Sequence, residues 1–173
     1  MAKIIENLHS TILNVGKQLL LEGGYEQMTL RRVAKECGIA PGTIYNYFPS
    51  KDILVATIML EDWQSLLEKA QPELLRADTV LAGIEKIFDI VHDYTCIYRG
   101  VWDSYGGSMI ISDERHGQLI AQLSKMIEGL FERFGTECIL NTPEFIAEVV
   151  LHAGTRKEVV FDSIAPFISR IMD

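Results

Sequence analysis

Residues 29–51 carry side chains that can bind anions and read base edges, spaced as two short helices and the start of a third. Arg31 and Arg32 fall in the first turn of one predicted helix, and Lys51 falls in the first turn of another. A cation at this end of a helix opposes the helix dipole, and each such cation typically costs about 0.3–1 kcal/mol of helix stability. An external anion held with the helix N-termini offsets that penalty, and a phosphate backbone is such an anion.

The order of residues predicts where these helices begin and end. Thr29 is a capping residue, Gly38 supplies a left-handed C-terminus, and Pro41 suits the first turn of the next helix. Ile44 and Phe48, one turn apart, give that helix a buried stripe. Buried positions of the first helix recur at helical spacing: Leu30, Val33, Ala34 and Cys37.

The second helix then points small, flat and amide side chains outward, including Pro41, Gly42, Tyr45 and Asn46. A helix-turn-helix places its second helix in the major groove, where such side chains can contact bases. The alternative is an ordinary helical hairpin inside an all-α domain. Charge favours the first interpretation, because residues 1–51 carry six Lys and Arg against four Asp and Glu, whereas the rest carry ten against twenty.

The N-terminal third resembles the signature of TetR-family repressors at several positions with correct spacing: Gly23-Gly24-Tyr25, Thr29, Val33-Ala34, Gly38-Ile39, Gly42-Thr43-Ile44-Tyr45, Tyr47-Phe48, Lys51 and Leu54. The resemblance implies an all-α fold, with a three-helix DNA-binding domain over 1–49 and a helical effector-binding and dimerisation domain over 50–173. It also implies a dimer that binds a palindromic operator and is modulated by a small molecule.

Carried over position by position, the resemblance makes Thr29 a phosphate-binding cap, and makes Tyr47 and Lys51 contacts to the DNA backbone. We add Arg31 and Arg32 to these contacts. The recognition surface is Ala40, Pro41, Gly42, Thr43, Tyr45 and Asn46. Many relatives have a hydroxyl residue at Ala40 and a charged or long polar residue at Pro41. We therefore expect Asn46 and Thr43 to do most direct reading, with Ala40, Pro41 and Tyr45 touching thymine methyl groups.

Other functional classes find little support. There is no phosphate-binding glycine loop, no nucleophile elbow around Ser108 and no close cluster with metal-ligand spacing, so we expect neither enzyme, cofactor nor metal. Nothing resembles a signal peptide, and no apolar run is long enough to span a membrane, so we expect a cytoplasmic protein. Cys37, Cys96 and Cys138 are expected to be buried thiols, with a redox-sensing Cys96 as the alternative. The four histidines, His9, His92, His116 and His152, are scattered along the chain, so a metal sensor is an alternative only if the fold brings them together.

Further helices follow the DNA-binding segment. The first helix of the chain has a stripe from Ile4 to Leu19 and should end at Gly23-Gly24. A long helix from Ser50 towards Pro72 should connect the two domains, and later helices are predicted near 78–98, 100–111 and 113–134. Thr142 should cap another, and a last helix should follow Gly154-Thr155.

The two terminal helices are strongly apolar and suit a four-helix dimer interface, although packing inside one chain is the alternative. The candidate interface residues are Phe145, Val149, Val160, Ile164, Phe167 and Ile168. The tail is shorter than is usual in the family.

A ligand site is harder to identify from the sequence, because aromatic side chains at helical spacing more often belong to the hydrophobic core than to a binding pocket. The candidates mix apolar surface with a few polar groups, as cavities do: Trp63, Phe88, His92, Cys96, Trp102, Tyr105, Met109 and His116. Glu85, Asp89 and Asp93 are interpreted as a solvated helix face. A helical protein-interaction module without specific DNA binding remains the alternative function.

Overall fold

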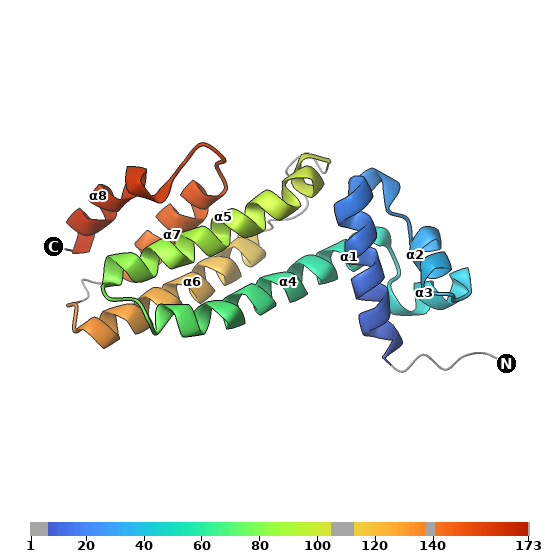
Figure 1. The fold of residues 1–173 in the computed structure, drawn as a ribbon, viewed down its shortest axis with the longest axis horizontal. Coiled ribbons are helices and arrows are strands. Elements are labelled where there is room, and N and C mark those ends of the chain that lie inside the picture. Colours follow the sequence, from blue (N-terminus) through green and yellow to red (C-terminus); the bar gives the residue numbers. More distant parts are fainter. Residues whose placement is uncertain (1–6, 105–112, 138–140, 173) are drawn as a thin grey trace. The chain divides into compact units, whose positions relative to one another are not determined.

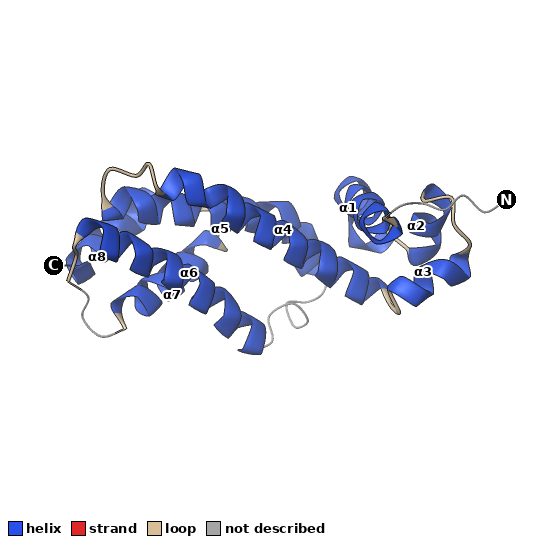
Figure 2. Cartoon of the chain, turned by 90° about the horizontal axis from the view of Figure 1, so that it is seen from below, coloured by secondary structure: helices blue, strands red, loops and turns tan. Residues whose placement is uncertain are grey.

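The computed structural model describes residues 7–104, 113–137 and 141–172, and within these ranges the chain is helical, without a strand (Figures 1 and 2). The helices are α1 (Leu8–Gln27), α2 (Leu30–Glu36), α3 (Pro41–Tyr47), α4 (Lys51–Leu74), α5 (Val80–Ser104), α6 (Asp113–Phe134), α7 (Thr142–Gly154) and α8 (Phe161–Met172). The all-α fold class is confirmed.

The chain forms two compact units. The N-terminal unit comprises Met1–Gln64 and Gly100–Gly106, and the C-terminal unit comprises Ser65–Arg99 and Gly107–Asp173. Two of the boundaries, 64/65 and 99/100, lie among the described residues, and they fall inside α4 and α5. These units reflect packing, whereas the division at residue 49 is a prediction about function.

In the N-terminal unit, α1 packs across α2 and the first part of α4. Gly16 of α1 allows close approach, since a Cβ there would lie 3.0 Å from Ile58 Cδ1. Lys17 reinforces the contact through an ion pair with Asp62 at 2.7 Å. Fully buried apolar side chains from all four helices or their ends form the core: Ile12, Leu20, Met28, Val33, Ile44 and Leu54.

The end of α1 differs from the prediction. The helix bends at Gly24, whose φ of 71° and ψ of 177° are not helical, and then continues to Gln27. The amide of Met28 donates to the Gly24 carbonyl at 3.3 Å, which closes this last turn. Glycine therefore interrupts the helix, as predicted, but does not end it. The predicted stripe residues Ile4 and Ile5 lie outside the described residues.

In the C-terminal unit, α5 touches each of α6, α7 and α8. Gly83 of α5 lies against Leu130 of α6, and Val91 lies against Gly154 of α7. The rings of Phe88 and Phe161 are 5.7 Å apart, which joins α5 to α8. This unit is therefore built around one central helix.

Three helix limits depart from the predictions. The segments predicted near 78–98 and 100–111 form one helix over Val80–Ser104, since exposed Gly100 costs some helix propensity but does not break α5. Residues 105–111 lie outside the described residues. The residue before α7 is Asn141, with φ 66°, and Thr142 is already helical rather than a cap. The α4 helix passes Pro72 and ends at Leu74, whose carbonyl accepts a 2.7 Å hydrogen bond from Arg133. The prediction for α6 is confirmed.

Candidate nucleic-acid interface

The α2 helix begins and ends as its sequence predicts. The backbone of Thr29 is extended, and its hydroxyl oxygen accepts a hydrogen bond from the Arg32 amide at 3.1 Å. This is the side-chain cap that satisfies one of the amides left over at a helix start. At the other end Gly38 has φ 68°, and the Ile39 amide donates to the Ala34 carbonyl at 3.0 Å. The turn between α2 and α3 is thus closed by glycine geometry.

The α3 helix has one buried and one exposed face. Ile44 is fully buried and Phe48, just past the helix, is 2% exposed. The outward residues predicted to meet bases are exposed, except that Thr43 is half-buried: Ala40, Pro41, Gly42, Tyr45 and Asn46. A row of exposed side chains on a short helix fixed by two anchors is what major-groove reading requires.

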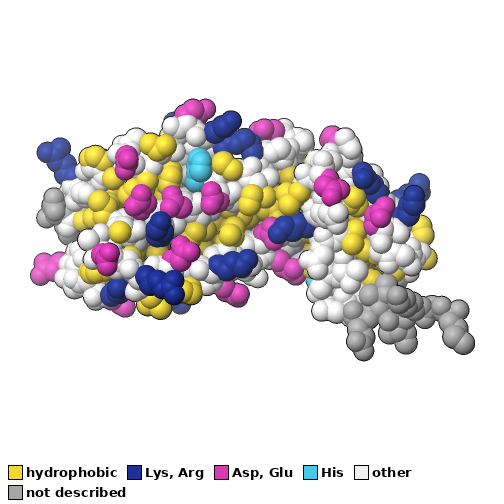
Figure 3. All heavy atoms as spheres, in the orientation of Figure 1, with side chains coloured by type: hydrophobic (Ala, Val, Ile, Leu, Met, Phe, Trp, Pro, Cys, Tyr) yellow, Lys and Arg dark blue, Asp and Glu magenta, His cyan; other side chains and the backbone are white. Residues whose placement is uncertain are grey.

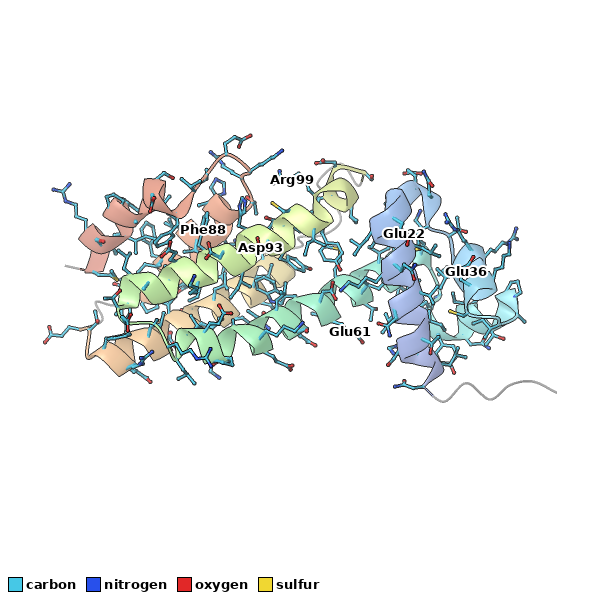
Figure 4. All side chains as sticks on the ribbon, in the orientation of Figure 1. Glu22, Glu36, Glu61, Phe88, Asp93 and Arg99 are labelled. Carbon is cyan, nitrogen blue, oxygen red and sulfur yellow. The ribbon has the colours of Figure 1, made fainter. Side chains whose placement is uncertain are left out.

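Cations flank this exposed face. Arg31 and Arg32 are exposed in the first turn of α2, which contains no acidic residue. Glu22 of α1 and Glu36 of α2 belong to the same unit (Figure 4), and Glu36 lies at the far end of α2. The first turn of α2 therefore places two cations at the positive end of the helix dipole, which favours an external anion.

Lys51 is held in place by Tyr25. Its Nζ donates to the Tyr25 carbonyl at 2.7 Å and lies 3.5 Å from the centroid of the Tyr25 ring. The Tyr25 hydroxyl in turn donates to the carboxylate of Asp52. The sequence placed Lys51 beside DNA through its position at a helix start and through the family resemblance, but it did not predict the contact with Tyr25. In the sequence, only the adjacency of Lys51 and Asp52, the two residues that Tyr25 contacts, hints at this arrangement.

Tyr47 lies beside His9 of α1. Its side chain is 41% exposed, and its ring centroid is 6.5 Å from that of His9. His9 also lies 5.2 Å from the ring of Phe48. His9 thus supports the end of α3, and nothing in the local pattern of α1 indicates this contact.

The candidate ligand residues belong to both units. Trp63 and Phe88 are each 3% exposed and belong to the cores of different units. His92 stacks on Phe88 at 5.8 Å, and its Nε2 lies 3.6 Å from the Cys96 sulfur. Its buried Nδ1 has no hydrogen-bond partner, so a polar group approaching it would be stabilised.

The remaining ligand candidates lie in different helices or outside the described residues. Trp102 is half-buried in the N-terminal unit, whereas His116 of α6 lies 3.3 Å from Glu148 of α7. Tyr105 and Met109 lie outside the described residues. The ligand assignment therefore remains a prediction.

The cysteines differ from one another. Cys37 is buried, and this burial, followed by the charge of Glu36, raises the pKa of its thiol. Cys96 is exposed, so the expectation that it is buried is wrong: it lies on the solvent side of α5. Cys138 lies outside the described residues.

The acidic stripe of α5 is a solvated face, as predicted. Asp89 and Asp93 are exposed, Glu85 is half-buried, and Lys86 lies 3.5 Å from Asp89. On the face drawn in Figure 3, acidic and basic side chains are interspersed over the C-terminal unit. No group of three His, Cys, Asp or Glu in the described ranges could hold a metal ion. None of the described helices has the length and apolar character to cross a membrane.

Apolar side chains of α7 and α8 are exposed. Phe145 and Phe167 are each 51% exposed, and their rings are 6.3 Å apart. Val160, just before α8, is 61% exposed, while Val149 and Ile164 are half-buried. Ile168 is fully buried within its own unit. The candidate interface residues thus divide into an exposed face and a core position.

Comparison with known proteins points to the same segment of the chain. The family model described as "Bacterial regulatory proteins, tetR family" matches residues 12–58, which span most of α1, the α2–α3 pair and the start of α4. Residues 12–58 therefore match the DNA-binding segment of the TetR family. The part matched contains every residue assigned above to DNA contact.

Similar proteins are transcriptional regulators. The HTH-type transcriptional regulator UidR of Escherichia coli is 29% identical over 162 residues, covering 93% of this chain and 74% of UidR. The regulator SCO7518 of Streptomyces coelicolor has a similar structure, with a TM-score of 0.66, 17% identity and coverage of 96% of this chain and 99% of that one. FadR of Bacillus subtilis in complex with stearoyl-CoA has a TM-score of 0.58, 15% identity and coverage of 95% and 97%. The two structures show that the TetR-family fold extends over the C-terminal unit.

Proposed function

We propose that this TetR-family regulator is a repressor that binds a palindromic operator as a homodimer and is modulated by a small molecule. The observation that carries the proposal is α3, with Ile44 buried and Tyr45 and Asn46 exposed beside the cations of α2. Buried anchors hold such a helix rigidly, and its exposed face is then available to base edges.

Within this interface, the two kinds of contact come from different residues. Asn46 has an amide that can pair with adenine N6 and N7, and the Thr43 hydroxyl can accept or donate. Arg31, Arg32, Tyr47 and Lys51 would contact phosphates, which position the protein and bring salt dependence without sequence preference. Few reading side chains in each protomer favour a dimer, because two half-sites multiply the available contacts.

The exposed face of α7 and α8 supports a homodimer. Phe145, Val160 and Phe167 leave apolar surface in water, and burying it against a second copy would remove that penalty. A two-fold arrangement would present two α3 helices to half-sites about 34–36 Å apart, which is one turn of DNA. The C-terminal helices would thus set the spacing of the operator.

The effector would act through the helices that belong to both units. The relative FadR, solved with stearoyl-CoA, supports a small-molecule effector for this chain without identifying it. His92, with its unpaired buried Nδ1, is the candidate polar contact in the C-terminal unit. An effector that releases DNA must bind the DNA-bound dimer more weakly, typically by about 1–3 kcal/mol.

Selection from randomised duplex DNA by the purified protein tests this proposal. We expect enrichment of a palindrome with half-sites about one helical turn apart. We also expect Tyr47→Ala to weaken binding of the selected duplex. No enrichment at low salt would refute sequence-specific binding and favour the protein-interaction module.

A further inference from the structure

The Lys51 ammonium, at the start of α4, is held by two groups of Tyr25. It donates one hydrogen bond to the carbonyl of Tyr25, at 2.7 Å, and lies 3.5 Å from the centre of that residue's ring. Lys51 is half-buried, unlike the exposed Arg31 and Arg32. An ammonium has three N–H donors, so this arrangement leaves donors for a further acceptor.

The ring that supports Lys51 is itself held from two sides. The chain bends at Gly24, where φ is 71°, immediately before Tyr25. The Tyr25 hydroxyl then donates to Asp52, the neighbour of Lys51 in the first turn of α4. A carboxylate in the first turn of a helix is favoured by the dipole, so Asp52 is stable as the charged acceptor. The bend and the carboxylate together fix the ring beneath the ammonium.

We propose that Tyr25 is a positioning residue for the phosphate contact made by Lys51. This inference rests on the proposed DNA binding. A free lysine side chain samples many rotamers, and it loses that freedom when it binds a phosphate. Holding the ammonium between a carbonyl and a ring removes part of this loss before DNA arrives. Tyr25 therefore raises affinity for every sequence, through Lys51, without touching DNA.

A double-mutant cycle on DNA affinity tests the inference. The four proteins are wild type, Tyr25→Leu, Lys51→Gln and the double variant, each titrated with the selected duplex over a range of salt concentrations. Tyr25→Leu is expected to weaken binding roughly two- to fivefold when Lys51 is present, the range of an exposed cation–π contact. In the Lys51→Gln background it should have no effect. Lys51→Gln should also reduce the salt slope by about 0.9 for each phosphate that the protein no longer neutralises.

A purely structural role for Tyr25 predicts a different result. Tyr25→Leu would then weaken binding equally in both backgrounds, and that additivity would overturn the inference. Tyr25→Phe provides a milder second variant if Tyr25→Leu unfolds, because it keeps the ring and removes only the bond to Asp52. It should weaken binding less than Tyr25→Leu, again only when Lys51 is present.

The cycle also separates this inference from the proposed function. If wild type binds no duplex at low salt, the proposed function fails and the positioning role fails with it. If wild type binds the selected duplex but Tyr25 and Lys51 act additively, the regulator proposal stands and only the role of Tyr25 is refuted.

Discussion

Thr29→Ala separates the capping of α2 from contact with DNA. The Thr29 oxygen accepts the Arg32 amide, so its loss should lower the free energy of unfolding by about 1 kcal/mol. A domain of ordinary stability, about 5–15 kcal/mol, would then still be folded in more than about 99% of molecules. Unfolding therefore cannot account for a measurable loss of DNA affinity.

The hydroxyl hydrogen of Thr29 remains available to donate to a phosphate. A hydrogen bond to a charged group is worth about 1.5–3 kcal/mol, so Thr29→Ala should weaken binding roughly ten- to hundredfold per half-site. Thermal unfolding by circular dichroism measures the first effect, and fluorescence anisotropy with the selected duplex measures the second. Thr29→Ser keeps the hydroxyl and is the matched control. A lower melting temperature with unchanged DNA affinity would show that the hydroxyl caps α2 and does nothing more.

Three further predictions address reading, assembly and packing. Asn46→Ala should relax base preference at one position per half-site and cost about 1–3 kcal/mol on the selected sequence, and an unchanged preference on repeated selection would remove its reading role. Phe167→Glu should dissociate the dimer in sedimentation experiments, whereas Ile97→Glu, at a similarly exposed apolar position on α5, should not; equal behaviour would exclude the α7–α8 face. Gly154→Ala should lower stability by about 1–3 kcal/mol in urea, because its methyl would lie 2.6 Å from a side-chain carbon of α5. Gly129→Ala, with open space around it in α6, should instead raise stability by about 0.8–1 kcal/mol, and the opposite order would contradict the packing argument.

Local signals made the α2–α3 segment predictable. The cap at Thr29, the left-handed Gly38 and the anchors Ile44 and Phe48 act over a few residues, so their spacing can be read directly. The same local reasoning overvalued Gly100, because a single glycine in a long apolar helix is outweighed by the packing of that helix.

Contacts between distant residues were beyond such reasoning. Tyr25 and Lys51 are 26 residues apart, and their contact depends on how α1 bends before α4 begins. The exposure of Cys96 likewise depends on which face of α5 meets α7 and α8, and the helical pattern around it left that choice open. The residues proposed to contact DNA could therefore be named from the sequence, whereas the contacts that hold Lys51 in place depend on the folded structure.

Two carbonyl groups at the end of α7 accept hydrogen bonds from side chains of α5. The Thr95 hydroxyl donates to the Gly154 carbonyl at 2.8 Å, and Arg99, labelled in Figure 4, donates to the Thr155 carbonyl at 3.3 Å. Sliding α5 by one turn along α7 would break both bonds and drive other side chains against Gly154. The two hydrogen bonds therefore fix the register of α5 against α7. If an effector moves α5, these bonds couple the exposed face of α7 to that movement, so the proposed dimer contact would take part in the response.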